Sequence, residues 1–147
     1  TYDFWFPRAI DPPALAIEGI GKALENLAAG FAKRSGLEVE TFIDEIRGPS
    51  RNIEATLYRI AQEALANIHR HAGATKVKLW LAGRDSFIDL TIEDDGIGFD
   101  WDGSAEPAPL GVGIMGMKER ATELGGSLAI RKLRKGSSVT ASLPYFA

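Results

Sequence analysis

FIDLTIED (residues 87–94), followed by DGIG (residues 95–98), is the stretch of this 147-residue chain that says most about its fold. The first eight residues alternate apolar and polar side chains, and side chains two residues apart in a strand point to the same face of a sheet. Asp94 therefore shares a face with the apolar residues of even number, and we expect that face to be buried. A buried carboxylate without a partner is strongly unfavourable, so Asp94 should be hydrogen-bonded or await a ligand that donates to it.

Two glycines, Gly96 and Gly98, follow this carboxylate and let a backbone or a flat ring approach closely. An isolated Asp-Gly pair is usually only a turn. Here a helix with a polar row precedes the strand, and a glycine-rich stretch opening a second helix follows it. Three elements therefore point to one site, which favours a functional reading of the glycine turn.

The composition fits one globular domain over residues 1–147, with 45% hydrophobic and 25% charged residues. A net charge of -3 gives no basic footprint for nucleic acid, so we expect no nucleic-acid partner. The absence of cysteine excludes disulfides and thiolate metal sites and fits a reducing compartment. No apolar run approaches the roughly 20 residues that span a bilayer. We expect a cytoplasmic chain that makes no membrane contact of its own.

Hydrophobic periodicity and turn residues predict the following order of elements. We expect a helix from Asp11 to about Lys33, an irregular extended segment over 37–46, a helix over 52–71, a hairpin of strands over 76–81 and 87–94, a lid-like loop over 99–112, a helix over 114–124, and two strands around Leu128 and Val139.

The helix over 52–71 carries a polar row beside its apolar one. Glu63 and Asn67 are four residues apart and so lie on one face, and His71 continues the row in the next turn. A carboxylate and an amide oxygen are hard donors that suit Mg²⁺ and the orientation of water near phosphates. Taken alone, however, this row also fits a solvated helix face.

The stretch GVGIMG (residues 111–116) stands at the entrance of the next helix, where unpaired N–H groups favour an anion. Gly111, Gly113 and Gly116 thus form a candidate phosphate cradle. The spacing also fits a dinucleotide fingerprint, but that motif needs a strand before it and a parallel unit after it. A polar, proline-containing loop precedes it instead, and antiparallel strands follow. Neither a Walker lysine pattern nor a protein-kinase catalytic loop occurs in the sequence.

This order of motifs resembles the GHKL ATPase superfamily, which includes DNA gyrase, heat-shock chaperone ATPases, MutL-type proteins and histidine kinases. LYRIAQEALANIHRHA (residues 57–72) is similar to the N box of sensor histidine kinases. Residues 111–120 and 124–126 resemble the NarL/DesK-type subfamily, as do residues 12–15 and 19–24 upstream. The resemblance covers nearly the whole chain.

The resemblance implies an α+β fold of the Bergerat type, a two-layer α/β sandwich in which a mixed, mostly antiparallel sheet packs on helices. ATP would lie under the lid, with its adenine amino group on Asp94 and its base beside Gly96 and Gly98. Asn67 would coordinate Mg²⁺, and Glu63 would position the metal or its water. These two residues are the catalytic candidates.

The resemblance also implies roles for other residues of the site. Gly111, Gly113 and Gly116 would wrap the phosphates, and Arg70 would meet phosphate, while His71 would form the pocket wall. Ser137 has the parity of Val139 and Ala141 and should point inward. Its hydroxyl would join the adenine network, although a plain turn serine is an equal alternative.

The resemblance also implies a function. A histidine kinase of this type carries a dimerising two-helix segment with a phosphoacceptor histidine before the ATP-binding domain, and residues 1–10 would be the remnant of that connection. We expect the chain to bind ATP and Mg²⁺ and, within its parent protein, to transfer the γ-phosphoryl to that histidine. A response regulator would be an indirect partner, and the parent could be anchored in a membrane. The alternatives are a GHKL ATPase, an anti-sigma-type serine kinase, and a degenerate nucleotide-binding interaction domain.

Overall fold

A computed structural model describes residues 13–96 and 111–146. Its elements are α2 (Pro13–Ser35), β1 (Glu38–Ile43), α3 (Arg51–Asn67), the π-helix η1 (Ile68–Ala72), β2 (Lys76–Arg84), β3 (Phe87–Asp94), α4 (Gly111–Glu123), β4 (Ser127–Lys132) and β5 (Ser137–Pro144). The strands form one sheet in the order β1-β2-β3-β5-β4. Among the described strands only the β1–β2 pair is parallel, so the predicted mixed and mostly antiparallel α+β sheet is confirmed.

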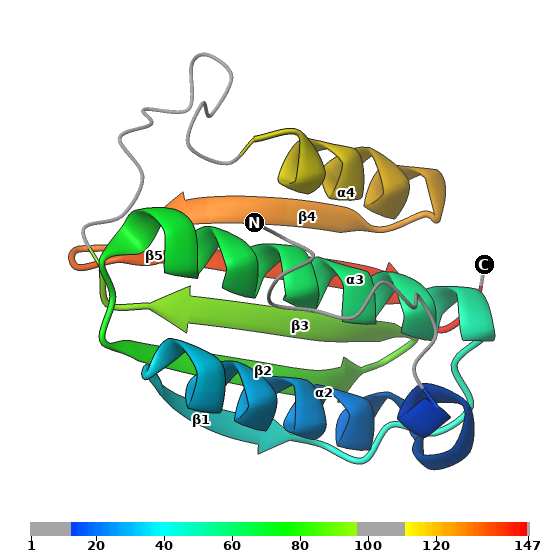
Figure 1. Cartoon of the computed structure of the whole chain (residues 1–147). Helices are drawn as coiled ribbons and strands as arrows, with labels where there is room; N and C mark the ends of the chain where they lie inside the picture. The colour runs from blue at the N-terminus through cyan, green and yellow to red at the C-terminus, as the bar shows by residue number, and fades with distance from the viewer. Residues whose placement is uncertain (1–12, 97–110, 147) are drawn as a thin grey trace.

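The three α-helices cover one face of the sheet, with α3 between α2 and α4 (Figure 1). In β3 the residues of even number are buried, as the alternation predicts. They meet a continuous apolar core that the helices complete. Its largest fully buried side chains are Phe31, Ile20, Leu24, Ile53, Leu57, Ile60, Leu65, Leu79, Leu81, Ile88 and Leu90. Burial of this apolar surface is the main force that holds the two layers together.

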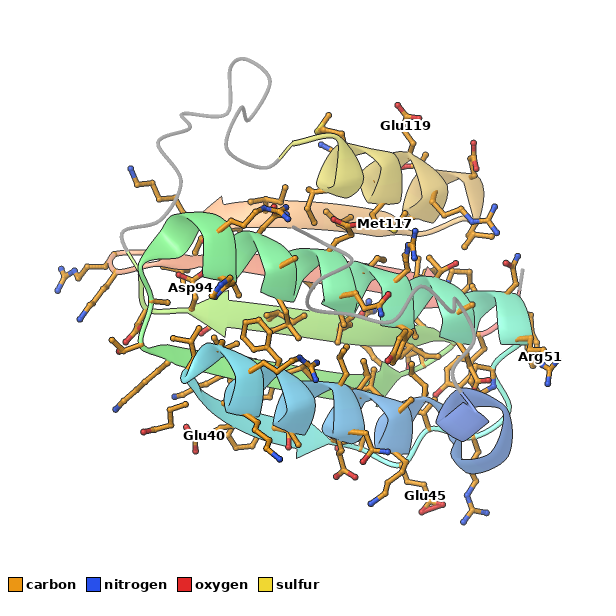
Figure 2. The ribbon with its side chains drawn as sticks, viewed as in Figure 1. Glu40, Glu45, Arg51, Asp94, Met117 and Glu119 are labelled. Atoms are coloured by element: carbon orange, nitrogen blue, oxygen red, sulfur yellow. The ribbon has the colours of Figure 1, made fainter. Side chains whose placement is uncertain are left out.

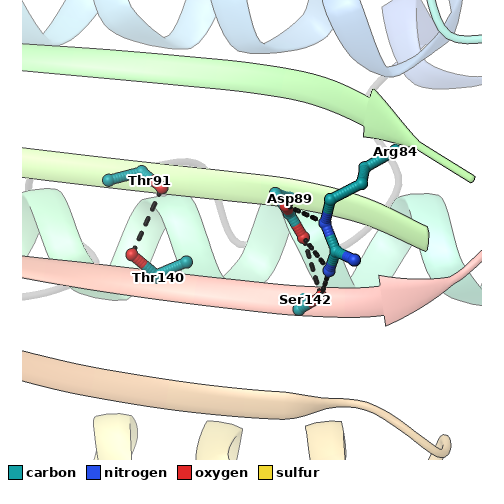
Figure 3. A network of polar contacts seen from close by, with 5 residues as sticks. All are labelled: Arg84, Asp89, Thr91, Thr140 and Ser142. Carbon is teal, nitrogen blue, oxygen red and sulfur yellow. Dashed lines mark hydrogen bonds and ion pairs between the residues drawn. The ribbon is translucent and has the colours of Figure 1, made fainter.

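The opposite face of the sheet carries polar side chains that bind one another across β2, β3 and β5 (Figure 3). Arg84 donates to Asp89 at 2.8 Å and to Ser142 at 3.0 Å, and the Ser142 hydroxyl donates to Asp89 at 2.7 Å. Thr91 and Thr140, which are direct register partners, share a hydrogen bond of 3.2 Å. Such partly exposed contacts contribute little energy each, but they favour the observed strand register.

The first two elements differ in detail from the sequence prediction. The helix α2 is interrupted at Gly19, whose φ of 87° and ψ of 176° are not helical. It ends at Ser35, before Gly36 at a positive φ of 79°. The strand β1 is shorter than the predicted segment 37–46, because the chain leaves the sheet after Ile43.

The helix α3 begins as expected for a capped helix, since the Ser50 hydroxyl accepts the Ile53 N–H at 3.3 Å. The prediction that one α-helix continues to His71 was wrong. The α-helical pattern ends at Asn67, and residues Ile68–Ala72 form a wider π-helical turn that closes at Gly73 in the left-handed conformation. Because the turn is wider, His71 does not follow Asn67 at α-helical spacing.

The helix α4 also departs from the prediction. It begins at Gly111, so the predicted loop over 99–112 extends too far, and Gly116 belongs to the body of the helix. Gly125 follows the helix at a φ of 89°, which matches the glycine stop in the sequence. The rest of the predicted lid lies outside the described residues. None of the helices in the described ranges is both long and apolar enough to span a membrane.

Candidate functional site

Three elements meet at one end of the molecule. The C-terminal ends of α3 and β3 lie on the same side in Figure 1, and the first turn of α4 meets α3 where Gly113 lies close to Glu63. They carry the polar motifs that the sequence singles out. The fold therefore brings the helix row, the carboxylate and the glycine-rich helix start together.

Asp94 lies at the end of β3 beneath α3 (Figure 2), and only 5% of it is exposed. The Gly96 N–H donates to its Oδ1 at 2.8 Å, and the Ser137 hydroxyl donates to its Oδ2 at 2.9 Å. Ser137 is 2% exposed. The predicted burial of Asp94 and the inward orientation of Ser137 are thus confirmed, while their roles in ligand binding stay predictions.

Burial raises the pKa of the Asp94 carboxyl, and the hydrogen bonds from Gly96 and Ser137 oppose this rise without cancelling it. A carboxylate has about four lone-pair positions, and the described residues use two of them. The carboxylate therefore retains the capacity to accept hydrogen bonds from a ligand. A donor that reached it would stabilise its charged form.

The turn before β5 lies in close contact with the backbone of Asp94. Gly136 has a φ of 94°, and a Cβ at this position would collide with the carbonyl group of Asp94. Glycine is therefore required here by both its conformation and the space. Gly96 is buried in the turn after β3, whereas Gly98 lies outside the described residues.

Asn67, the last residue of α3, is 2% exposed. Its Oδ1 accepts a hydrogen bond of 2.8 Å from Arg70. Its Nδ2 is buried and has no partner within the described part of the chain. A buried donor without an acceptor is costly in a folded protein, so this amide indicates a place for an acceptor atom of a ligand.

Glu63, one turn before Asn67, is half-buried and touches the start of α4. Burial raises the pKa of its carboxyl, and the charges of Arg59 and Arg70 partly oppose this rise. A Cβ on Gly113 would collide with the Glu63 carboxylate, so the two elements are in close contact there. The structure thus joins Glu63 to the predicted cradle at Gly113.

The other members of the predicted site are less closely involved. A Cβ on Gly116 would meet open space, because this residue is already in the second turn of α4. Gly111 is the first residue of that helix. The side chain of His71 lies outside the described residues. His69 packs edge-on against Phe31 of α2, with ring centroids 6.5 Å apart.

Sequence reasoning missed the role of Asp95. Its carboxylate accepts the Lys76 N–H at 2.9 Å and both the N–H and the hydroxyl of Thr75 at 2.8 Å. These hydrogen bonds, that from Lys76 foremost, lower its pKa to about 2. Strand parity places Asp95 on the opposite face from Asp94, and this signal was available in the sequence.

A groove of about 470 Å³ lies between α3 and α4. Arg59, Met117 and Arg120 are among its lining residues. Arg120 is held in place by a hydrogen bond of 2.7 Å to Asn52. Nothing in the sequence pattern pointed to this groove, since its walls come from distant parts of the chain.

The donor set fits a metal only in part. No cluster of three acidic, histidine or cysteine side chains that could hold a metal ion occurs among residues 13–96 and 111–146. Asn67 and Glu63 offer one amide oxygen and one carboxylate. Mg²⁺ at phosphates is commonly held by one or two protein ligands together with phosphate oxygens and water, so this small set is of the right kind.

A two-layer α/β sandwich with an acidic strand end, an asparagine-bearing helix and a glycine-rich helix start fits the GHKL class of domains. Residues 52–146 match the model of the histidine kinase-, DNA gyrase B- and HSP90-like ATPase family, and the chain belongs to this family.

Relatives of the chain in sequence include sensor histidine kinases. The chain is 34% identical over 145 residues to the sensor histidine kinase MctS of Rhizobium johnstonii, covering 96% of this chain and 30% of that protein. It is 33% identical to the sensor histidine kinase LiaS of Bacillus subtilis, covering 92% and 37%. It is 34% identical to the sensor protein VraS of Staphylococcus saprophyticus, covering 83% and 34%. The chain thus spans about a third of the length of these relatives.

Solved structures support the fold. The histidine kinase domain of the blue-light activated histidine kinase EL346 from Erythrobacter litoralis superposes with a TM-score of 0.69 at 21% identity, over 86% of this chain and 61% of that chain. The histidine kinase AdeS of Acinetobacter baumannii gives a TM-score of 0.61 at 21% identity, over 88% and 62%. These two structures share the fold of the chain.

Proposed function

We propose that the chain binds ATP with Mg²⁺ and presents the γ-phosphoryl group to a histidine on a separate two-helix segment of its parent protein. The observation that carries this proposal is the buried carboxylate of Asp94, which keeps accepting capacity that two protein donors do not use. An adenine amino group is a donor of the right kind. The raised pKa of Asp94 indicates that the free site is unfavourable until such a donor arrives.

The phosphate end of the nucleotide would lie between α3 and α4. The unpaired Nδ2 of Asn67 would donate to a phosphate oxygen, and its Oδ1 would face the metal. Mg²⁺ would supply charge neutralisation of the phosphates. The N–H groups in the first turn of α4, from Gly111 to Gly113, would donate to the same phosphates, with the helix dipole favouring their charge.

The chain's own contribution to transfer is positioning and electrostatic stabilisation. The Glu63 carboxylate lies close to Gly113 and would orient the metal or a water. The acceptor is proposed to come from outside the chain. The exposed His69 ring makes an edge contact with Phe31 of α2.

The test uses the parent protein with its two-helix segment and radiolabelled ATP. We expect a protein-bound phosphate that is labile in acid and stable in base, and its loss in Asn67→Ala. The matched control is Asp89→Asn, on the outer face of the sheet, which should keep normal labelling. A phosphate that is stable in acid would instead indicate a serine acceptor and would refute the histidine assignment.

A second candidate function is ATP hydrolysis. The specific observation in its favour is Glu63, because burial raises its pKa in the direction that suits a general base. In that case the protein would release inorganic phosphate at a rate that depends on Glu63 and would not retain a protein-bound label. Phosphate release measured beside the labelling experiment separates the two functions.

A further inference from the structure

The oxygen of Asn67 that is proposed to face Mg²⁺ already has a cationic partner in the free chain. Arg70 donates from Nη2 to Asn67 Oδ1 at 2.8 Å. A guanidinium group has no acceptor, so the amide must turn its oxygen toward Arg70 and its Nδ2 toward the unpaired buried position. Arg70 therefore fixes which atom of the Asn67 amide points where.

The local fold places this arginine. Arg70 lies three residues after Asn67, inside the π-helical turn Ile68–Ala72. It is exposed at the surface, so its guanidinium can leave the contact without repacking the core. Its charge also acts on Glu63, the second oxygen donor of the candidate site.

We propose that Arg70 is a positioning residue that occupies the metal position of Asn67 Oδ1 until a metal and nucleotide replace it. Arg70 and the divalent cation then compete for one oxygen atom. This inference rests on the proposed function. Its consequence is that Arg70 sets how strongly nucleotide binding depends on Mg²⁺, apart from any contact of its own with phosphate.

The measurement is the dissociation constant of ATP by calorimetry, once with saturating Mg²⁺ and once with EDTA. The ratio of the metal-free constant to the Mg²⁺ constant reports the benefit of the metal. Arg70→Ala should raise this ratio roughly tenfold over the wild type, because the metal no longer has to displace a charged hydrogen-bond donor from Asn67 Oδ1. Arg70→Lys, which keeps a donor and its charge, should return the ratio to within about threefold.

The control variant is Arg47→Ala, which removes one positive charge from an exposed pair with Glu45 and should leave the ratio unchanged. Thermal unfolding of each variant verifies that it is folded. In an Asn67→Ala background the further change Arg70→Ala should no longer alter the ratio, because the shared oxygen is gone.

An unchanged ratio in Arg70→Ala overturns the inference even if both affinities fall, since that result makes Arg70 a phosphate contact only. A ratio that still rises in the Asn67→Ala background overturns it as well. A wild-type chain that binds ATP under neither condition refutes the proposed function and, with it, this inference. ATP binding with an unchanged ratio refutes the inference alone.

Discussion

The substitution Asp94→Asn separates the stability of the free fold from its affinity for nucleotide. Asparagine has almost the same shape as aspartate. Its oxygen can still accept the Gly96 N–H, and its amide can donate to the Ser137 hydroxyl, which can rotate to accept. Both hydrogen bonds of the free site therefore survive. What is lost is the negative charge and the spare accepting capacity that would meet an adenine amino group.

The effect on stability follows from the direction of the pKa shift. Burial raises the pKa of Asp94 above its unfolded value of 3.8. The Asp94 carboxyl therefore favours folding most in its protonated form. This contribution to the free energy of unfolding is fully present below the unfolded pKa and is lost as the pH rises through the folded pKa. At neutral pH the ionised side chain is thus a net cost to the fold. Asp94→Asn removes that cost, so the free variant should be as stable as the wild type or slightly more stable.

The effect on affinity has the opposite sign. A hydrogen bond to a charged group contributes about 1.5 to 3 kcal/mol, so losing it should weaken ATP binding by roughly 10 to 100-fold. Calorimetry with ATP and Mg²⁺, together with urea unfolding of the free chain at pH 7, gives both quantities. The control is Asp89→Asn on the same strand, which should leave the affinity unchanged and lower the stability slightly through its pair with Arg84.

Two results would refute this reasoning. An unchanged affinity in Asp94→Asn would mean that adenine does not meet this carboxylate. A loss of more than about 2 kcal/mol of stability would mean that the ionised Asp94 carboxylate stabilises the free fold through its hydrogen bonds, so that its accepting capacity is not available to a ligand.

Three further substitutions test the surroundings of the site. Asp95→Asn should lower the free energy of unfolding at pH 7 by about 1 to 2 kcal/mol. This deficit relative to the wild type should disappear as the pH falls from the unfolded pKa of 3.8 to the folded pKa of about 2, which acid unfolding measures. The reason is that the stabilisation by a carboxylate with a lowered pKa is lost over that interval. Gly113→Ala should keep or raise the thermal midpoint, because alanine favours a helix and the flexible Glu63 carboxylate can move aside. The same variant should reduce phosphotransfer at least several-fold. Normal phosphotransfer would exclude a role for the contact between Gly113 and Glu63. Gly136→Ala should cost more than about 2 kcal/mol by chemical denaturation, because the rigid carbonyl of Asp94 cannot move aside and the φ is positive; a stable variant would contradict the close packing of this turn.

Much of the sheet could be predicted because strand periodicity is local. The alternation in residues 87–94 places Asp94 on the buried face, and the parity of Ser137 with Val139 places its hydroxyl inward. The two side chains are register partners in adjacent strands, and this pairing brings them within hydrogen-bond distance. Two separate parity arguments therefore led to one real contact.

The end of α3 and the start of α4 could not be predicted from the sequence, for a different reason. The π-helical turn after Asn67 differs from an α-helical turn by only about one residue, and hydrophobic spacing over five residues does not register that difference. Glycines have low helix propensity, so the segment from Gly111 to Gly113 reads as loop, yet the structure makes it helical. The contact of Arg70 with Asn67 depends on this turn and on side-chain conformations, which no sequence pattern specifies.

Asp94 and Asp95 are neighbours in the chain but lie on opposite faces of the sheet, and they differ in their hydrogen bonds and in the direction of their pKa shifts. Asp95 has its hydrogen bonds satisfied by Thr75 and Lys76, and its lowered pKa marks it as stabilising. Asp94 has a raised pKa and unused accepting capacity. The other unfavourable groups, the unpaired Nδ2 of Asn67 and the half-buried Glu63 carboxyl, belong to the same end of the molecule. An adenine amino group, a phosphate oxygen and a divalent cation would relieve these three costs, and a metal-bound adenine nucleotide carries all three, in agreement with the proposed function.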